Sequence, residues 1–375
     1  MSAAVTDFIV GSNSVSEWAH RYLWVRLSMQ SGTPLNKRAL AFTIIGVVFF
    51  VAYLVWSNPL EAFAEVGAFN IPIYLVAVAV DFLGLMFWAT SWYLILRAMK
   101  VEIGLWTTTQ LSFTSLFIGW IAPLPLMTEM VRAYLIKDRS TSNLGKGLSS
   151  VLVHRAYYNI AFGLIIGGTT FITLASGRQI PINPAVSWFL TAFALVSVAV
   201  FILVLNKRAL TYIYSKSPQF VRRRVFDKYR DSETGENGFN HVIDDIADAI
   251  RALKAEMGLN LAAFAMLVFH WSAGVVTTYL SAIALGVQLD ISTAIFAFAF
   301  VEFLQQINFF IPSGIGILDA GLAGALVLAG IPLSMAAAIS LLTRLATYWL
   351  EIALCTPIAF RLGYKEFLAK YFDGG

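Results

Sequence analysis

Long apolar runs alternate with short polar connections along most of this chain. A helix needs about 20 mainly apolar residues to cross the hydrocarbon core of a bilayer, and six runs approach or exceed this length. We predict six transmembrane helices, at residues 39–56, 71–96, 148–175, 185–205, 259–285 and 332–360. The pattern therefore indicates an all-α, polytopic membrane protein.

Two further apolar stretches, at residues 105–136 and 291–330, contain helix-breaking residues. Pro123 and Pro125 interrupt the first stretch, and the segment from Pro312 to Gly316 interrupts the second. Lipid cannot satisfy the backbone groups that a broken helix leaves free, so such a break must be buried in protein or line a wet cavity. We predict that each stretch forms a re-entrant helical hairpin; a flexible external loop is the alternative.

Basic residues mark one side of the predicted topology. The segment 207–230 contains eight basic residues and one acidic residue, and the two ends of the chain are also basic, which places all three in the cytoplasm. Both hairpins must then return to the side from which they enter. The predicted order is a cytoplasmic arm with an interfacial helix, a first membrane half, a cytoplasmic connection with an amphipathic surface helix, a second membrane half and a cytoplasmic tail, at residues 1–38, 39–205, 206–258, 259–360 and 361–375.

The two parts that contain hairpins have matching landmarks. Arg155 follows Pro123 by 32 positions, and Arg344 follows Pro312 by the same number. Because the predicted topology runs in opposite directions through the two parts, they form an inverted repeat. Inverted repeats with broken helices are typical of transporters whose binding site lies near the middle of the membrane.

The composition narrows the class of protein further. Of the 375 residues, 58% are hydrophobic and only 13% are charged, which lies outside the soluble globular range. The single cysteine, Cys355, excludes an intrachain disulfide. The sequence contains no nucleotide-binding loop, no Cys/His cluster with metal-ligand spacing and no Ser-His-Asp arrangement. We therefore expect no cofactor, no metal and no nucleic-acid partner.

Ionisable side chains inside the apolar segments are the candidates for function, because each costs about 2.5–3.5 kcal/mol to insert. From these side chains and the second hairpin tip we predict a substrate site formed by Glu129, Arg132, Arg155, Tyr158, Pro312, Gly314, Gly316, Asp319 and Arg344. Candidates for proton coupling are His154, His270 and Glu302. Arginine suits an anionic headgroup because its planar donors match phosphate. Ion pairs that only hold the hairpins in place are the alternative.

The motifs of both hairpins resemble the family of transmembrane regions of lysylphosphatidylglycerol synthases, a flippase-like family. The residues that carry the resemblance are Glu129-x-x-Arg132 and Arg155, followed by Pro312, Gly314, Gly316, Asp319, Gly330 and Arg344. The resemblance implies a lipid-handling membrane protein, since this region moves the aminoacylated lipid in bifunctional members and accompanies hopanoid or polyprenyl-linked glycan pathways in others. The chain departs from the family pattern at Thr128, where Gly is usual, and at His154 and Asp319, where Glu is usual.

Together these features predict a flippase or transporter in the plasma membrane that moves an anionic or lipid-linked substrate between leaflets. We expect no enzyme activity. In particular, we expect no aminoacyl transfer, because no soluble synthase domain follows residue 360 in this sequence. The alternative is a membrane subunit or intramembrane enzyme of a lipid-glycan or isoprenoid-lipid pathway. Membrane lipids are the expected partners, and a lipid-biosynthetic enzyme is a further candidate.

Overall fold

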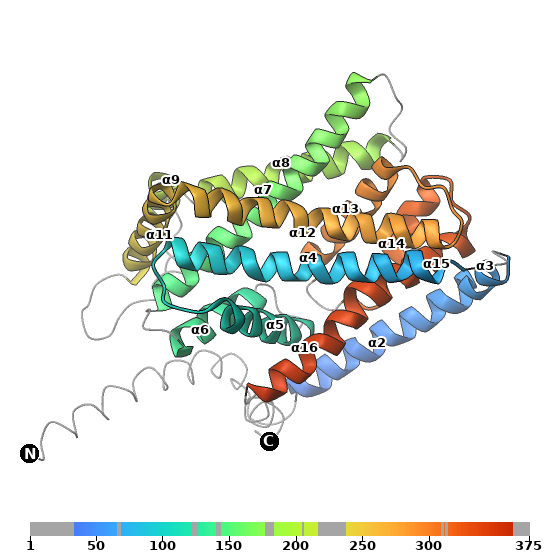
Figure 1. Ribbon diagram of the computed structural model, residues 1–375, viewed down its shortest axis with the longest axis horizontal. Coiled ribbons are helices and arrows are strands. Elements are labelled where there is room, and N and C mark those ends of the chain that lie inside the picture. The colour runs from blue at the N-terminus through green and yellow to red at the C-terminus, as the bar shows by residue number, and fades with distance from the viewer. Residues whose placement is uncertain are drawn as a thin grey trace, which may run out of the picture.

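The computed structural model describes residues 34–65, 69–121, 127–139, 144–176, 184–204, 206–216, 238–308, 311 and 314–362. These residues form helices joined by short turns, and no strand occurs among them (Figure 1). The predicted arm helix, the arginines of segment 217–237, the end of the tail, and the prolines Pro123, Pro125 and Pro312 lie outside the described residues.

The helices fall into two similar series. The first series is α4 (Ile71–Ala98), α5 (Leu105–Ile121), α6 (Met127–Arg139) and α7 (Leu144–Ala175). The second is α12 (Met257–Ala284), α13 (Ile291–Ile307), α14 (Ile317–Leu328) and a long last helix that consists of α15 (Leu333–Arg344), the π-helical turn η4 (Leu345–Trp349) and α16 (Leu350–Arg361). The helices outside the two series are α2 (Pro34–Ser57), α3 (Pro59–Glu65), α8 (Pro184–Val204), α9 (Lys207–Lys216) and α11 (Gly238–Ala255).

Each predicted span coincides with a helix. Within the described residues, four helices are long and apolar enough to cross a membrane, namely Ile71–Ala98, Lys146–Ala175, Met257–Ala284 and Leu333–Arg361. The other two predicted spans form α2, of 24 residues, and α8, of 21 residues. Each interrupted stretch forms two helices that pack against each other, α5 on α6 and α13 on α14, as a hairpin requires.

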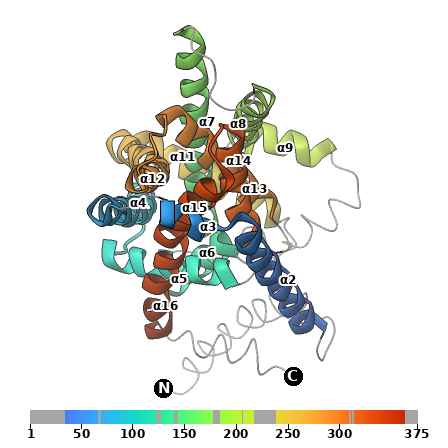
Figure 2. The ribbon, with the colours of Figure 1, turned by 90° about the vertical axis from the view of Figure 1, so that its right-hand side faces the viewer.

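Helices α4 and α12 lie side by side and run in opposite directions (Figures 1 and 2). Hydrogen bonds link Asn70 N to Ala284 O at 2.9 Å, Thr277 Oγ1 to Ala77 O at 3.2 Å, His270 Nδ1 to Gly84 O at 2.9 Å and Ser91 Oγ to Ala263 O at 2.8 Å. Every seven residues forward on α4 correspond to seven residues backward on α12. The two helices are therefore antiparallel along almost their whole length.

The contact between α4 and α12 also reveals how the two series are related. Pro123 and Pro312 are 189 positions apart, and the same offset relates Gly84 to Ala273. A Cβ atom on Gly84 would lie 2.6 Å from the Cβ of Ala273, so these two equivalent positions touch. Equivalent positions of antiparallel helices meet only where a two-fold axis passes between them. The axis of the repeat thus runs between Gly84 and Ala273, where the missing side chain allows close approach.

The other helices of the two series obey the same symmetry. Helix α6 ends at Arg139 and α14 at Leu328, and α7 begins at Leu144 and α15 at Leu333; both pairs are 189 positions apart. The first hairpin packs on the second series through α5 and α16, and the second hairpin packs on the first series through α13 and α7. The inverted repeat predicted from the sequence is therefore present in the helix arrangement. The depth of the hairpins in a membrane stays a prediction.

Large apolar side chains cover much of the outer surface. Examples more than half exposed are Val55 and Trp56 on α2, Phe171 on α7 and Val196 on α8. Soluble monomers rarely expose continuous apolar surface of this kind, whereas lipid chains cover it without penalty. The protein is an integral membrane protein.

One predicted surface helix has a different environment. The amphipathic segment expected at the membrane surface forms α11, and its apolar residues Ile246, Ala249 and Leu253 are each at most 4% exposed. Helix α11 packs on α7 and α12, so its apolar face covers one end of the bundle. Amphipathic periodicity alone does not distinguish a protein neighbour from a lipid one, and the location of α11 at the membrane surface stays a prediction.

Candidate functional site

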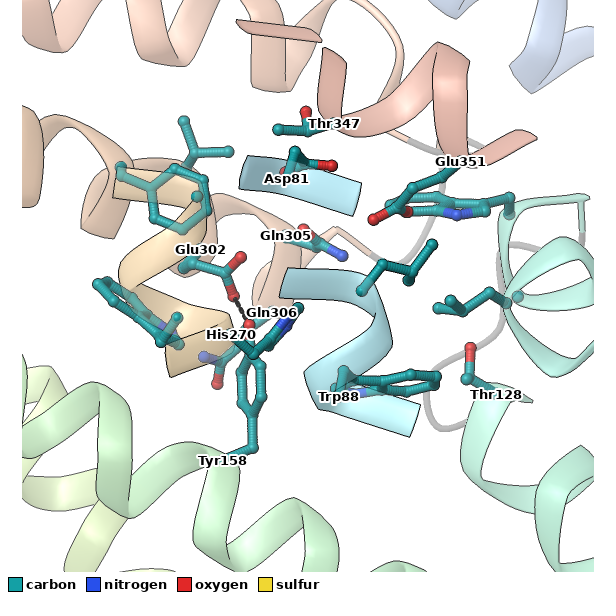
Figure 3. Close-up of a pocket in the computed structure, with 18 of the residues that line it drawn as sticks. Asp81, Trp88, Thr128, Tyr158, His270, Glu302, Gln305, Gln306, Thr347 and Glu351 are labelled. Atoms are coloured by element: carbon teal, nitrogen blue, oxygen red, sulfur yellow. Dashed lines mark hydrogen bonds between the residues drawn. The ribbon is translucent and has the colours of Figure 1, made fainter. Parts of the chain in front are cut away.

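A polar cavity of about 320 Å³ lies where the two repeats meet (Figure 3). Side chains from α4 to α7 and from α12 to α16 line it, so neither repeat forms it alone. Eight of the predicted site residues line this cavity: Glu129, Arg132, His154, Arg155, Tyr158, His270, Glu302 and Arg344. Three others, Gly314, Gly316 and Asp319, are not among the residues that line it, and Pro312 lies outside the described residues.

Arg155 on α7 is the most accessible of the three arginines that line the cavity. Its Nη1 lies 3.5 Å from Oε1 of Glu129, in the first turn of α6, and its guanidinium lies 5.3 Å from the ring centre of Tyr158. The side chains of Arg155 and Glu129 are 29% and 15% exposed. Charge-assisted hydrogen bonds are usually 2.7–2.9 Å long, so this loose pair leaves Arg155 with donors for another anion.

Arg344 at the end of α15 has the equivalent position in the second repeat, 189 residues later. Its Nε lies 3.4 Å from Oδ1 of Asp319, and the two side chains are only 6% and 5% exposed. Its guanidinium lies 4.5 Å from the ring centre of Tyr348, within the π-helical turn. Each repeat therefore pairs an acid at the start of the second hairpin helix with an arginine on the following helix.

Asp319 also holds the tip of the second hairpin. Its Oδ2 accepts a hydrogen bond of 2.9 Å from the backbone N–H of Gly316. Gly316 has a φ of +83°, and a Cβ atom there would lie 2.7 Å from Cδ1 of Phe49 on α2. Only glycine fits this backbone conformation and this close approach. A single carboxylate thus connects the tip to Arg344.

The contacts of Arg132 on α6 differ from the alternative prediction, in which acids pair with the arginines. Its guanidinium lies 4.5 Å from the ring centre of Trp88 and 5.0 Å from that of Trp92, and the residue is 1% exposed. Its Nη1 donates to Nδ1 of His154 at 3.2 Å. Indole faces stabilise a desolvated guanidinium by about 2 kcal/mol or more, so the two tryptophans add to the electrostatic attraction of Glu129.

The same contacts fix the state of His154. Arginine can only donate, so Nδ1 must accept and carries no proton. Nε2, 3.2 Å from the backbone oxygen of Trp88, then carries the ring proton and donates. His154 is thus a neutral imidazole that orients Arg132. Its role in proton coupling stays a prediction.

Acidic and amide side chains fill the rest of the cavity wall. The hydroxyl of Tyr158 donates to Oε2 of Glu302 at 2.6 Å, drawn as a dashed line in Figure 3. Asp81 on α4 is 8% exposed and has no hydrogen bond or ion pair with another described residue. In the described residues, no group of three or more His, Cys, Asp or Glu side chains is placed to hold a metal ion.

Sequence reasoning missed several of the lining residues, of which the main ones are Trp88, Trp120, Thr128, Gln305, Gln306 and Asn308. The three amides offered a signal, because they lie within four positions at the end of an otherwise apolar helix. The tryptophans offered none, since an indole in a transmembrane helix is more often an interfacial anchor.

The model of the family described as the lysylphosphatidylglycerol synthase TM region matches residues 39–355. The chain belongs to this family. Three proteins of Methanothermobacter thermautotrophicus, each named UPF0104 membrane protein, are similar to it along most of their length. They are 21%, 22% and 20% identical over 323, 332 and 330 residues, which cover 84–85% of this chain and 90–94% of each relative. Their names state a membrane location and no activity.

The expected departures of this chain from the family pattern now have a structural setting. His154, where the lysylphosphatidylglycerol synthase family is expected to have Glu, hydrogen-bonds Arg132. Asp319, the shorter acid, both pairs with Arg344 and caps the N-terminus of α14. Two of the three positions that vary from the pattern therefore still contact arginines of the cavity, and the third, Thr128, lines the cavity.

Proposed function

We propose that this protein moves a membrane lipid with an anionic headgroup from one leaflet to the other. The observation that carries the proposal is the charged cavity, which both halves of the inverted repeat build together. Sites at the interface of inverted repeats become accessible from either side of the membrane in turn. Membership of a family of lipid-synthase membrane regions supports a lipid as the substrate.

The size and chemistry of the cavity favour a headgroup. Its volume of about 320 Å³ lies at the lower end of the range for small-molecule sites, about 300–1,000 Å³. This is room for a phosphate and a small polar group, and the acyl chains would stay against the apolar exterior. Among the described residues, three arginines and no lysine line the cavity, and guanidinium donors suit the oxygens of phosphate.

The topology belongs to the proposal as well. The two hairpins enter from opposite faces of the plasma membrane, and both ends of the chain lie in the cytoplasm, as the placement of basic residues favours. The antiparallel packing of α4 and α12 supports opposed repeats. Transport by this chain requires no nucleotide and no cofactor.

Reconstitution of the purified protein tests the proposal. In vesicles that contain fluorescent phosphatidylglycerol, dithionite destroys the label in the outer leaflet only. With active protein we expect the label of the inner leaflet to be lost as well, and Arg155→Gln to abolish this loss. Arg251→Gln is the matched control, because Arg251 lies exposed on α11, paired with Asp248 and away from the cavity.

The outcomes separate the classes of function. Loss of the inner label with wild type and with the Arg251→Gln control, but not with Arg155→Gln, supports transport through this site. A chemically changed lipid would show an intramembrane enzyme instead. Inactivity in every lipid mixture, relieved only by a partner synthase, would show a membrane subunit of a biosynthetic complex.

A further inference from the structure

We infer that Arg155 and Arg344 are two equivalent phosphate-binding positions that the headgroup occupies in turn, with Arg155 available in the present conformation and Arg344 in the opposite one. This inference rests on the proposed function and deepens it. It assigns a closed second binding position, built from Arg344, Asp319 and Tyr348, that becomes accessible only when the first closes.

The first support is that the two positions contain the same kinds of group, an arginine, an acid and a tyrosine, with the acids and the tyrosines one position away from the 189-residue offset. Each arginine lies close to an acid of the preceding hairpin, at 3.5 Å and 3.4 Å. Each guanidinium also lies over a tyrosine ring of its own helix, Tyr158 or Tyr348. The two arginines are related by the offset that relates Gly84 to Ala273 on the two-fold axis. An arrangement that binds phosphate in one repeat is therefore built to bind it in the other.

The second support is that equivalent pairs differ in accessibility. The Arg155–Glu129 side chains are 29% and 15% exposed and both residues line the cavity. The Arg344–Asp319 side chains are only 6% and 5% exposed; Arg344 lines the same cavity, whereas Asp319 is not among its lining residues. Since the two pairs contain the same kinds of group, we attribute the difference in exposure to the conformation of the two repeats. Exchange of the two conformations would open the second pair and close the first.

Glu129 and Asp319 each supply the anionic partner of an arginine when no headgroup phosphate is bound. A guanidinium in a low-dielectric site needs an anion, and removal of its partner destabilises the protein. When a lipid phosphate replaces Glu129 beside Arg155, the arginine keeps an anionic partner throughout. The same replacement at Asp319 also releases the backbone N–H of Gly316, so occupation of the second position loosens the tip of the second hairpin.

The third support is a reciprocal contact between each hairpin and the opposite arginine. Glu302, on the first helix of the second hairpin, accepts a hydrogen bond from Tyr158 beneath Arg155. Trp120, on the first helix of the first hairpin, packs edge-on against Tyr348 beneath Arg344, with ring centres 5.0 Å apart. Movement of either hairpin therefore disturbs the arginine of the other repeat, which gives the two positions a physical connection.

Cysteine accessibility tests whether the positions alternate. Thr128 and Ile317 are reporters, because they are 189 positions apart and each lies within two residues of the paired acid. Single cysteines are placed there after Cys355, which is buried, is changed to alanine. The rate of modification by a charged, membrane-impermeant thiol reagent is then measured in phosphatidylcholine vesicles.

We expect Arg344→Gln to raise the rate at Ile317→Cys severalfold and to lower the rate at Thr128→Cys. Arg155→Gln should do the reverse, and Arg251→Gln should change neither rate. A rise at one reporter with no fall at the other would overturn alternation, because the pairs would then open independently. If Arg344→Gln does not fold, Arg344→Lys keeps the charge and tests the same reciprocity with a smaller shift.

Ligand arms identify the source of the phosphate. Phosphatidylglycerol added to the vesicles should slow modification at Thr128→Cys, whereas inorganic phosphate should not. Protection by inorganic phosphate alone would assign the site to a soluble anion and overturn the lipid assignment. The modification rates at the two reporter cysteines are measured without any lipid movement. If lipid transport is intact but the two rates do not change in opposite directions, only this inference is refuted. If the rates change in opposite directions but no transport occurs, only the proposed function is refuted.

Discussion

The buried ion pair of the second repeat should stabilise the protein much more than its equivalent in the first. In the wild-type protein the backbone N–H of Gly316 donates a hydrogen bond of 2.9 Å to Oδ2 of Asp319. The amide oxygen of Asp319→Asn can still accept this hydrogen bond, so the substitution removes mainly the charge. With side chains 5% and 6% exposed, loss of the partner leaves Arg344 desolvated and should cost about 3 kcal/mol or more. Glu129→Gln affects a partly exposed pair and should cost about 1 kcal/mol or less.

Unfolding of the purified protein by denaturing detergent, followed by tryptophan fluorescence, measures both costs. A double-mutant cycle with Arg344→Gln isolates the interaction between the two side chains. We expect the double variant to be less destabilised than the sum of the two single variants. Equal costs for the two acids, or additive effects in the cycle, would refute the reasoning that burial separates the two pairs.

Three smaller predictions concern the cavity and the symmetry axis. Asp81→Asn should raise the melting temperature, because it neutralises a buried carboxylate that has no partner in the described residues; a lower melting temperature would show an unseen favourable interaction. Gly84→Ala should destabilise the protein by about 1–3 kcal/mol through overpacking against α12. Gly167→Ala, which meets no atom within 4 Å, should be neutral or stabilising by up to about 1 kcal/mol in the same unfolding assay. Tyr158→Phe should slow lipid movement in the dithionite assay while leaving the protein folded, because it removes the hydroxyl that donates to Glu302; an unchanged rate would show that this bond has no part in transport.

The helices and their order could be read from the sequence because the bilayer imposes simple rules. Helix length follows from membrane thickness, and breaks in apolar segments mark hairpins. The spacing of Pro123, Arg155, Pro312 and Arg344 then identified the repeat. The structure adds the contact of Gly84 with α12, which places the axis. No single-residue pattern in the sequence points to that contact.

The site could be predicted only in part, since partners come from tertiary packing. Glu129 and Arg132 are one helical turn apart, yet Glu129 pairs with Arg155 on α7. Arg132 instead lies over two indole rings of α4, and the apolar sequence of that helix does not indicate this contact. Insertion cost identifies which residues need a partner, but not which partner they find.

The amphipathic segment that forms α11 illustrates the same limit on the surface. Its periodicity predicts one apolar face correctly, and Ile246, Ala249 and Leu253 do form that face. The neighbour of the face is the helical bundle and not lipid. Periodicity describes a helix by itself, whereas its neighbour depends on where the connection brings it.

Leaflet-resolved mass spectrometry of unlabelled lipid tests the central claim most directly. Phosphatidylglycerol is loaded into the outer leaflet of nucleotide-free vesicles that contain only the purified protein, and the amount that cyclodextrin can extract is followed with time. We predict that the extractable amount falls as lipid reaches the inner leaflet, that its mass stays unchanged, and that Arg155→Gln stops the fall. An extractable amount that stays constant with the wild-type protein, or a lipid of altered mass, would contradict the account.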